Sequence, residues 1–172
     1  MQSGEQALQA RASLGGDGRV SVSTGLSVLD HLLELLATYA GLDLTLEVAP
    51  GGPDATTAAA GRSLGEALRG FVRQKGVKGY GWAIVPADEA LASVGLEASD
   101  RALLVTNVDL SDAHVAGLER DLVTAFLNEL SEAAGLTLHV RLLHGEDAGH
   151  VLESIFKALG GALAVAGSPR KE

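Results

Sequence analysis

The sequence predicts an α+β fold made of two copies of one unit, with helices packed between two sheets. Residues 40–46 resemble residues 134–140 at an offset of 94, and residues 64–68 fall on residues 159–163 with one residue of slip. Segments that alternate in hydrophobicity are interleaved with segments whose apolar residues recur at helical spacing. Because neither half by itself can bury both of its helices, the apolar stripes of all the helices must pack together.

The elements of the first unit follow from these local patterns. They are expected, in chain order, as a hairpin of residues 6–14 and 19–24, a helix over 26–39, a strand over 42–48 and a helix over 55–74. The run Gly15-Gly16-Asp17-Gly18 is typical of a hairpin turn. Asp54 precedes the second helix and is its expected N-cap.

The second unit repeats this order. Its expected elements are a hairpin of residues 90–97 and 102–108, a helix over about 113–133, a strand over 136–143 and a helix over 148–166. We therefore expect a single domain, 1–172, with pseudo-repeats at about 6–79 and 88–166, an extended connection over 80–87 and a tail over 167–172.

Composition excludes several classes of protein. The chain of 172 residues is 47% hydrophobic and 20% charged, which excludes intrinsic disorder. Its formal net charge of −9 argues against nucleic-acid and anionic-membrane partners, and the absence of Cys excludes disulfides, Cys-ligated zinc and thiol nucleophiles. The polar N-terminus is no signal peptide and no apolar run approaches about 20 residues, so a cytoplasmic protein is expected. The remaining candidates for catalytic or metal-binding groups are the carboxylates and the five histidines.

The last helix carries the most suggestive polar residues. His150, Glu153 and Lys157 share one face, where a His and a Glu one turn apart can bind a divalent metal and a Lys can bind phosphate. A solvated helix face with a Glu–Lys pair explains the same spacing, and helix physics alone favours it. In the first helix, His31 beside Asp30 is either a surface histidine or a metal ligand. His139 is expected to be a structural histidine in its strand.

Four segments together resemble the imidazoleglycerol-phosphate dehydratase family of histidine biosynthesis, in family order and spacing: residues 23–34, 85–91, 135–141 and 150–158. The resemblance implies the duplicated fold, similar to domain 2 of ribosomal protein S5, and trimers that assemble into a 24-subunit particle. It also implies a dimanganese site at subunit contacts, and elimination of water from imidazoleglycerol phosphate through an imidazolate-like intermediate.

The chain departs from this family at the metal ligands. Among the positions where the resemblance implies a ligand, only three still hold one: His31, His150 and Glu153. Five carry other residues: Asp54, Ala55, Ala58, Ala125 and Gly149. Manganese prefers nearly octahedral nitrogen and oxygen donors, and Ala or Gly supplies none from a side chain. We therefore expect a divergent member with a degenerate metal site that holds no manganese or holds it weakly.

Other positions implied by the resemblance are better kept. Arg101 and Lys157 match residues that bind the substrate phosphate, and Lys78 stands beside the position of a further arginine. Asp88 and Glu89 match a pair near the active site and are the candidate catalytic residues. These polar groups fit either a surviving phosphate site or contacts between subunits.

Three functions remain open. The first is a dehydratase-like homo-oligomer, a trimer or a 24-mer, that has lost most of its chemistry and binds a phosphorylated small molecule. The second is a working carbon–oxygen lyase with a rebuilt site of one metal around His31, His150 and Glu153. The third is a different enzyme on the same scaffold, with Asp54 or Asp88 as general base.

Overall fold

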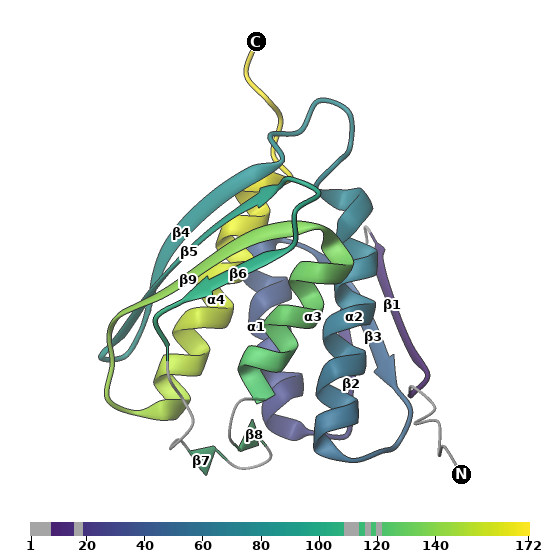
Figure 1. Cartoon of the computed structure of the whole chain (residues 1–172), viewed down its shortest axis with the longest axis vertical. Helices are drawn as coiled ribbons and strands as arrows, with labels where there is room; N and C mark the ends of the chain where they lie inside the picture. Colours follow the sequence, from purple (N-terminus) through teal and green to yellow (C-terminus); the bar gives the residue numbers. More distant parts are fainter. Residues whose placement is uncertain (1–7, 16–18, 109–113, 116–117, 120–121) are drawn as a thin grey trace.

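The elements of the chain form two similar series joined by one strand (Figure 1). A computed structural model describes residues 8–15, 19–108, 114–115, 118–119 and 122–172. The first series is β1 (Ala10–Gly15), β2 (Val20–Ser23), α1 (Ser27–Ala40), β3 (Asp43–Val48) and α2 (Pro53–Phe71). After β4 (Tyr80–Ala87), the second series is β5 (Ala90–Ala98), β6 (Leu103–Thr106), α3 (Leu122–Ala134), β9 (Leu136–His144) and α4 (Ala148–Ala166), with the short β7 (His114–Val115) and β8 (Leu118–Glu119) preceding α3.

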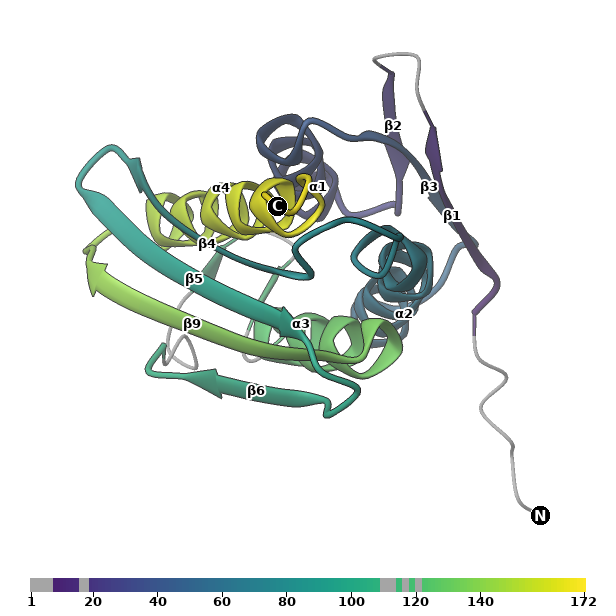
Figure 2. The same ribbon diagram turned by 90° about the horizontal axis from the view of Figure 1, so that it is seen from above.

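The four helices lie between two sheets, as Figure 2 shows. Helices α1 and α2 pack against the sheet of order β1-β3-β2, and α3 and α4 pack against the sheet of order β4-β5-β9-β6. Within the helical layer α1 contacts α4, and α2 contacts α3. The predicted fold class is therefore confirmed.

Strand pairing inside each unit differs from the predicted hairpins. Strands β1 and β2 both pair with β3, antiparallel and parallel respectively, so β3 lies between them. Strands β5 and β6 pair with β9 in the same two ways. Alternation shows which side chains share a face of a sheet, but it does not show which strand lies next to which. Strand β5 instead forms a hairpin with β4, which turns at Asp88 and Glu89.

Two helix starts were also predicted wrongly. The N-cap of α2 is Gly52, and Asp54 lies in the first turn rather than at the cap. Helix α3 begins at Leu122 instead of about residue 113, after the small β7–β8 ladder. Most of the span 109–121 and the turn residues 16–18 lie outside the described residues. Helix α4 has its predicted bounds, and its N-cap Asp147 accepts a hydrogen bond from the His150 backbone N–H.

Glycines set how closely the paired helices approach. A Cβ on Gly160 of α4 would collide with the Leu36 carbonyl oxygen of α1. A Cβ on Gly65 of α2 would lie 2.8 Å from the Leu130 carbonyl oxygen of α3. Gly65 and Gly160 occupy equivalent positions in the two matched segments, residues 64–68 and 159–163. Each unit therefore has a glycine at the point where its second helix crosses a helix of the other unit.

Among the described helices, α4 is the one that is long and apolar enough to span a membrane. Its 19 residues reach a mean hydropathy of 1.2, which by length and composition is enough to cross a membrane. In the fold, 56% of this stretch is buried, and the helix packs on β4, β5 and α1. Phe156 lies 5.5 Å from the Phe126 ring of α3, centroid to centroid, at the centre of the core. Burial in the core thus accounts for the hydrophobicity of α4.

Candidate functional site

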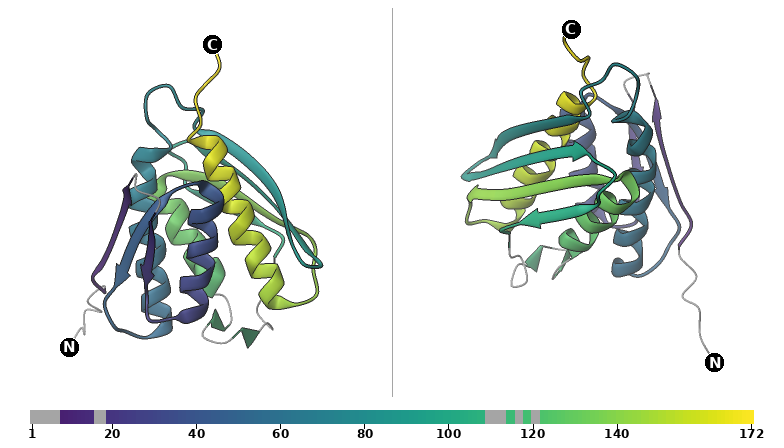
Figure 3. Two further views of the ribbon diagram at one scale, coloured as in Figure 1. Left: turned by 180° about the vertical axis from the view of Figure 1, so that it is seen from behind. Right: turned by 45° about the horizontal axis from the view of Figure 1, so that its top comes forward.

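Helices α1 and α4 pack on each other and run in the same direction (Figure 3, left), and a pocket lies between their N-terminal halves. The pocket has a volume of about 270 Å³ and is lined by Ser27, Val28, His31, Leu32, Gly149, Leu152 and Glu153. Parallel packing of the helices places His31 opposite Glu153, and their Nε2 and Oε1 atoms are 3.1 Å apart. Two of the three predicted metal ligands therefore meet at the mouth of this pocket.

Glu89 connects the β4–β5 turn to the start of α4. Its Oε1 accepts hydrogen bonds from the backbone N–H groups of Asp147 and Glu146, at 2.8 and 3.3 Å. Its Oε2 lies 2.6 Å from His150 Nδ1. The backbone carbonyl of Glu89 lies 2.9 Å from His144 Nδ1. The turn and the helix end are thus joined by four polar contacts.

These contacts shift two pKa values in opposite directions. The Asp147 backbone N–H, helped by His150, lowers the pKa of Glu89 from 4.5 to about 2. The Glu89 carboxylate in turn raises the pKa of His150 above its ordinary 6.5. The pair therefore favours a carboxylate beside an imidazolium when no metal is present.

The geometry also orients the His150 ring. With Glu89 ionised, Nδ1 carries the proton and donates to the carboxylate, and in the neutral ring Nε2 then holds a free lone pair. A carboxylate that fixes the tautomer in this way is the usual partner of a metal-binding histidine. Asp88, Glu89 and His150 each offer a ligand atom, and these atoms lie within 4.8 Å of one another. The three ligand atoms are thus close enough together to share one ion.

The corresponding positions between α2 and α3 lack such donors. By the internal repeat, His31 corresponds to Ala125 and Glu153 to Ala58, while His150 corresponds to Ala55. Gly149 corresponds to Asp54, which is exposed and is the one residue there with a ligand oxygen. A site of two manganese ions needs close to six donors for each ion. The donor set implied by the resemblance does not fit the residues present.

The three predicted phosphate residues lie apart within one copy of the chain. Lys157 lies on α4, with its Nζ 5.6 Å from the centre of the Tyr39 ring. Lys78 precedes β4 and Arg101 precedes β6, and these strands are the opposite edges of the four-stranded sheet. Three strand spacings separate them, about 14 Å.

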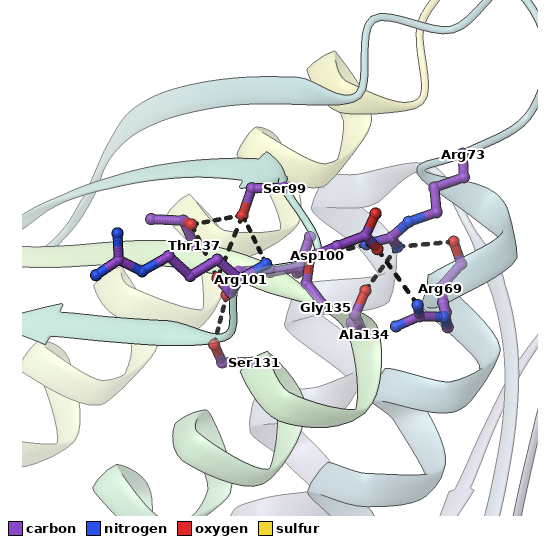
Figure 4. Close-up of polar contacts among 10 residues, drawn as sticks. Arg69, Arg73, Ser99, Asp100, Arg101, Ser131, Ala134, Gly135 and Thr137 are labelled. Atoms are coloured by element: carbon purple, nitrogen blue, oxygen red, sulfur yellow. Dashed lines mark hydrogen bonds and ion pairs between the residues drawn. The ribbon is translucent and has the colours of Figure 1, made fainter.

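A network beside Arg101 was not predicted (Figure 4). Arg69 and Arg73 of α2 both bind the Asp100 carboxylate, at 3.3 and 3.2 Å. Arg73 also donates to the carbonyl oxygens that end α3, at 2.6 Å for Ala134 and 2.8 Å for Gly135. The i, i+4 spacing of the two arginines was a visible signal, but their partner lies in a distant turn.

This network holds the turn that positions Arg101. Asp100 has a φ of +59°, an uncommon conformation for a residue other than glycine. Ser99 Oγ accepts the Arg101 backbone N–H at 3.3 Å, and Thr137 donates to the Arg101 carbonyl oxygen at 3.0 Å. The Arg101 side chain extends away from the two arginines of α2 (Figure 4). The network thus has a structural role next to a predicted phosphate residue.

The fold and site define an α+β protein with a duplicated unit and a pocket of histidines and carboxylates between helix ends. A model of the family described as imidazoleglycerol-phosphate dehydratase matches residues 24–163. The chain belongs to the imidazoleglycerol-phosphate dehydratase family. Its curated relatives include the dehydratase of Clostridium botulinum strain Kyoto, which is 37% identical over 93% of this chain and 84% of its own length. The dehydratase of Syntrophobacter fumaroxidans is 40% identical over 92% of this chain and 83% of its own length.

Solved structures of the family have the same fold. The Pyrococcus furiosus enzyme, in complex with (S)-C348, superposes with a TM-score of 0.87 at 30% identity, over 99% of this chain and 95% of that one. The Staphylococcus aureus dehydratase superposes with a TM-score of 0.86 at 32% identity, over 94% of this chain and 95% of that one. The predicted family resemblance is therefore confirmed.

Proposed function

We propose that this chain is a divergent imidazoleglycerol-phosphate dehydratase-like protein whose dehydratase chemistry is lost or strongly impaired. The observation that carries the proposal is the contrast between two equivalent helix pairs. His31 and Glu153 form a pair between α1 and α4, whereas Ala125 and Ala58 hold the equivalent positions of α3 and α2. No change of rotamer or protonation supplies a ligand atom from an alanine.

The remaining donors support at most a weak site for one metal. His150 is well oriented by Glu89, but Gly149 stands where the family resemblance implies a second histidine. His31 and Glu153 lie on α1 and α4, where they pair with each other. Few donors and exposed positions both lower the affinity for manganese, so the cofactor is absent or weakly bound.

Other properties of the family are expected to persist. Arg101, Lys157 and Lys78 lie on separate elements of one copy, and we expect a phosphate site to combine some of them with residues of neighbouring copies. We propose a cytoplasmic homo-oligomer, a trimer or a 24-mer, that still binds a phosphorylated small molecule. Glu89 then acts mainly by positioning the start of α4, and Asp88 and Glu89 have catalytic roles only if turnover survives.

One observation favours an alternative, a functional dehydratase with a rebuilt site. The Glu89–His150 contact and the neighbouring Asp88 form a cluster that suits a single divalent ion. Such an enzyme would be a carbon–oxygen lyase that works with one metal instead of two.

Metal content and turnover distinguish the two functions. The purified chain is loaded with manganese and assayed with imidazoleglycerol phosphate beside the Staphylococcus aureus dehydratase as control. We expect less than one manganese per chain and turnover lower by at least 1,000-fold, because a Lewis-acid contribution of several kcal/mol is absent. Stoichiometric manganese and turnover near the control would contradict this. If activity is found and His150→Ala abolishes it, the rebuilt site is the correct interpretation.

A further inference from the structure

The turn between β5 and β6, residues 99–102, carries the predicted phosphate residue Arg101 past the start of β9. Both strands are neighbours of β9, so the turn crosses β9 where that strand begins. The Ser99 backbone N–H donates to the Gly135 carbonyl oxygen at 3.3 Å, and the hydroxyl oxygens of Ser99 and Thr137 are 2.6 Å apart. Residues 99–102 belong to no helix or strand, so side-chain contacts hold this turn in place of strand pairing.

Asp100 ties the turn to helix α2. Its Oδ1 atom accepts hydrogen bonds from Arg69 Nη2 at 3.3 Å and from Arg73 Nη2 at 3.2 Å. The Asp100 side chain is 75% exposed, whereas that of Arg73 is only 25% exposed and also donates to the carbonyl oxygens of Ala134 and Gly135. The exposed carboxylate is therefore bound to a cation whose own position is fixed by the end of α3.

Gly135 provides the space that the two arginines occupy. It follows the last residue of α3 with a φ of +66°, and a Cβ on it would lie 2.6 Å from Arg73 Nη2 and 2.7 Å from Arg69 Nη1. A glycine in the left-handed region after a helix is common, but here it also admits two guanidinium groups to the helix end. The place of both arginines is thus part of the packing of α2 on α3.

The anchor and Arg101 lie on opposite sides of the turn. Asp100 has a φ of +59°, a conformation that aspartate tolerates and that glycine adopts freely. The Asp100 carboxylate points toward α2, and the side chain of the next residue, Arg101, extends the other way (Figure 4). A rotation of the backbone at Asp100 would therefore redirect the Arg101 guanidinium.

We propose that Asp100 is a positioning residue for Arg101. Its carboxylate, anchored by Arg69 and Arg73, holds the turn so that the Arg101 guanidinium meets the phosphate group of a phosphorylated small molecule. A guanidinium that is already oriented loses less conformational freedom when the phosphate binds. The inference rests on the proposed phosphate site and adds to it three residues that do not touch the phosphate.

Charge and position predict opposite results when Asp100 is removed. Loss of a negative charge beside a phosphate site strengthens phosphate binding, because the carboxylate repels the anion and neutralises nearby arginines. Loss of the anchor weakens phosphate binding, because Arg101 must then be ordered by the phosphate itself. Asp100→Gly separates the two effects, since glycine adopts a φ of +59° without strain while the carboxylate is lost.

The affinity of the full-length protein for inorganic phosphate is measured by isothermal titration calorimetry in metal-free buffer. We expect Kd to rise by about two- to tenfold in Asp100→Gly, which is the cost of ordering one long side chain on binding. The rise is smaller in Arg69→Gln, which removes one of the two ion pairs, and largest in Arg101→Ala. In protein that already carries Arg101→Ala, Asp100→Gly causes no further rise, because Asp100 acts through Arg101.

Two measurements exclude a general effect on the fold. Glu129→Gln is the matched control, since it removes a carboxylate that pairs with another arginine of α2, Arg62, at 3.4 Å, and it keeps the wild-type Kd. Hydrogen exchange of the Arg101 amide, which donates to Ser99 Oγ, becomes faster in Asp100→Gly and is unchanged in Glu129→Gln. Thermal unfolding shows whether each variant is folded, and Arg69→Gln gives an independent second test of the anchor.

The outcomes separate this inference from the proposed function. If Arg101→Ala raises Kd but Asp100→Gly and Arg69→Gln do not, the positioning role is wrong and the proposed phosphate site stands. A further rise on adding Asp100→Gly to Arg101→Ala also overturns the positioning role alone. If wild type binds no phosphate, or Arg101→Ala binds it as tightly as wild type does, both the positioning role and the proposed part of Arg101 in the phosphate site are wrong.

Discussion

The two ends of the helical layer have the same packing and different chemistry. Where α1 meets α4, Gly160 permits close approach, and His31 and Glu153 pair at the mouth of a pocket. Where α3 meets α2, Gly65 permits the same approach, but Ala125 and Ala58 hold the equivalent positions. The duplicated chain has thus kept its core contacts in both units while the polar residues differ between them.

This difference shows that fold and function are constrained by different atoms. A glycine at a helix crossing is required because any Cβ there strikes a backbone carbonyl. A ligand at the helix surface contributes almost nothing to stability, so its replacement by alanine leaves the fold intact. Similarity to family structures over 99% of the chain is therefore compatible with an altered site.

The largest expected effect comes from making the two ends alike. A variant carrying Asp54→His, Ala55→His, Ala58→Glu, Ala125→His and Gly149→His restores a nitrogen or oxygen donor at each lost position. We expect it to bind manganese at least about 100-fold more tightly than wild type, since changes around a metal site typically alter affinity by 10- to 100-fold. Titration followed by manganese electron paramagnetic resonance measures this. Gly149→His alone is the control, and we expect its manganese affinity to increase much less. Equal manganese affinity of wild type and the restored variant would show that the missing donors do not distinguish the two helix pairs.

The next effect tests whether the packing is equivalent at both ends. Gly160→Ala and Gly65→Ala each force a Cβ against a backbone carbonyl oxygen, and we expect each to lower the free energy of unfolding by about 1–3 kcal/mol. Urea denaturation measures both. In Gly70→Ala, also in α2, the new Cβ meets nothing within 4 Å, so this control is expected to be neutral or up to about 1 kcal/mol more stable. A large loss at one crossing alone would show that the two ends do not pack alike.

A third prediction concerns the pH dependence of the α1–α4 end. The pKa of Glu89 is lowered to about 2, so its contribution to stability is present above pH 4.5 and is lost as the pH falls toward 2. The pKa of His150 is raised, so its contribution is present below pH 6.5 and is lost as the pH rises through the raised pKa. NMR titration of chelator-treated protein is expected to show a lower His150 pKa in Glu89→Gln than in wild type. An unchanged pKa of His150 would show that Glu89 and His150 do not interact in solution.

The smallest effect is expected at the pair that distinguishes the two ends. His31→Ala and Glu153→Gln break a contact between side chains that are 55% and 34% exposed. Exposed ion pairs contribute from about 0 to 1 kcal/mol, so each variant is expected to lower the free energy of unfolding by no more than this. A double-mutant cycle in urea measures the coupling. A coupling above about 2 kcal/mol would show that this pair stabilises the fold.

Much of the fold could be predicted because its elements repeat locally. The bounds of α4 and the apolar faces of the helices follow from spacing along the chain. The neighbours of each strand did not follow, because β3 enters between β1 and β2 after an intervening helix. The start of α3 was missed because the apolar pattern continues through the β7–β8 ladder.

The site was only partly predictable for the same reason. The spacing of His150 and Glu153 placed them on one helix face, yet His150 pairs with Glu89 and Glu153 pairs with His31. Both partners lie far away in sequence. The role of Asp147 as N-cap and the contact of His144 with the turn were not foreseen, because both depend on where the β4–β5 turn lies. His139 was expected to be a structural histidine, but its side chain is exposed on the four-stranded sheet.

The sequence by itself determined the family and most of the order of helices and strands, since each depends only on which residues stand at which positions. Tertiary structure alone decided which surviving polar groups meet: His31 with Glu153, His150 with Glu89, and Asp100 with two arginines of α2. It also decided that Trp82, Ile84 and Leu143 of the four-stranded sheet are exposed. The physical reason is that these contacts join residues far apart in the chain, so they are specified by the packing of helices and sheets rather than by local spacing.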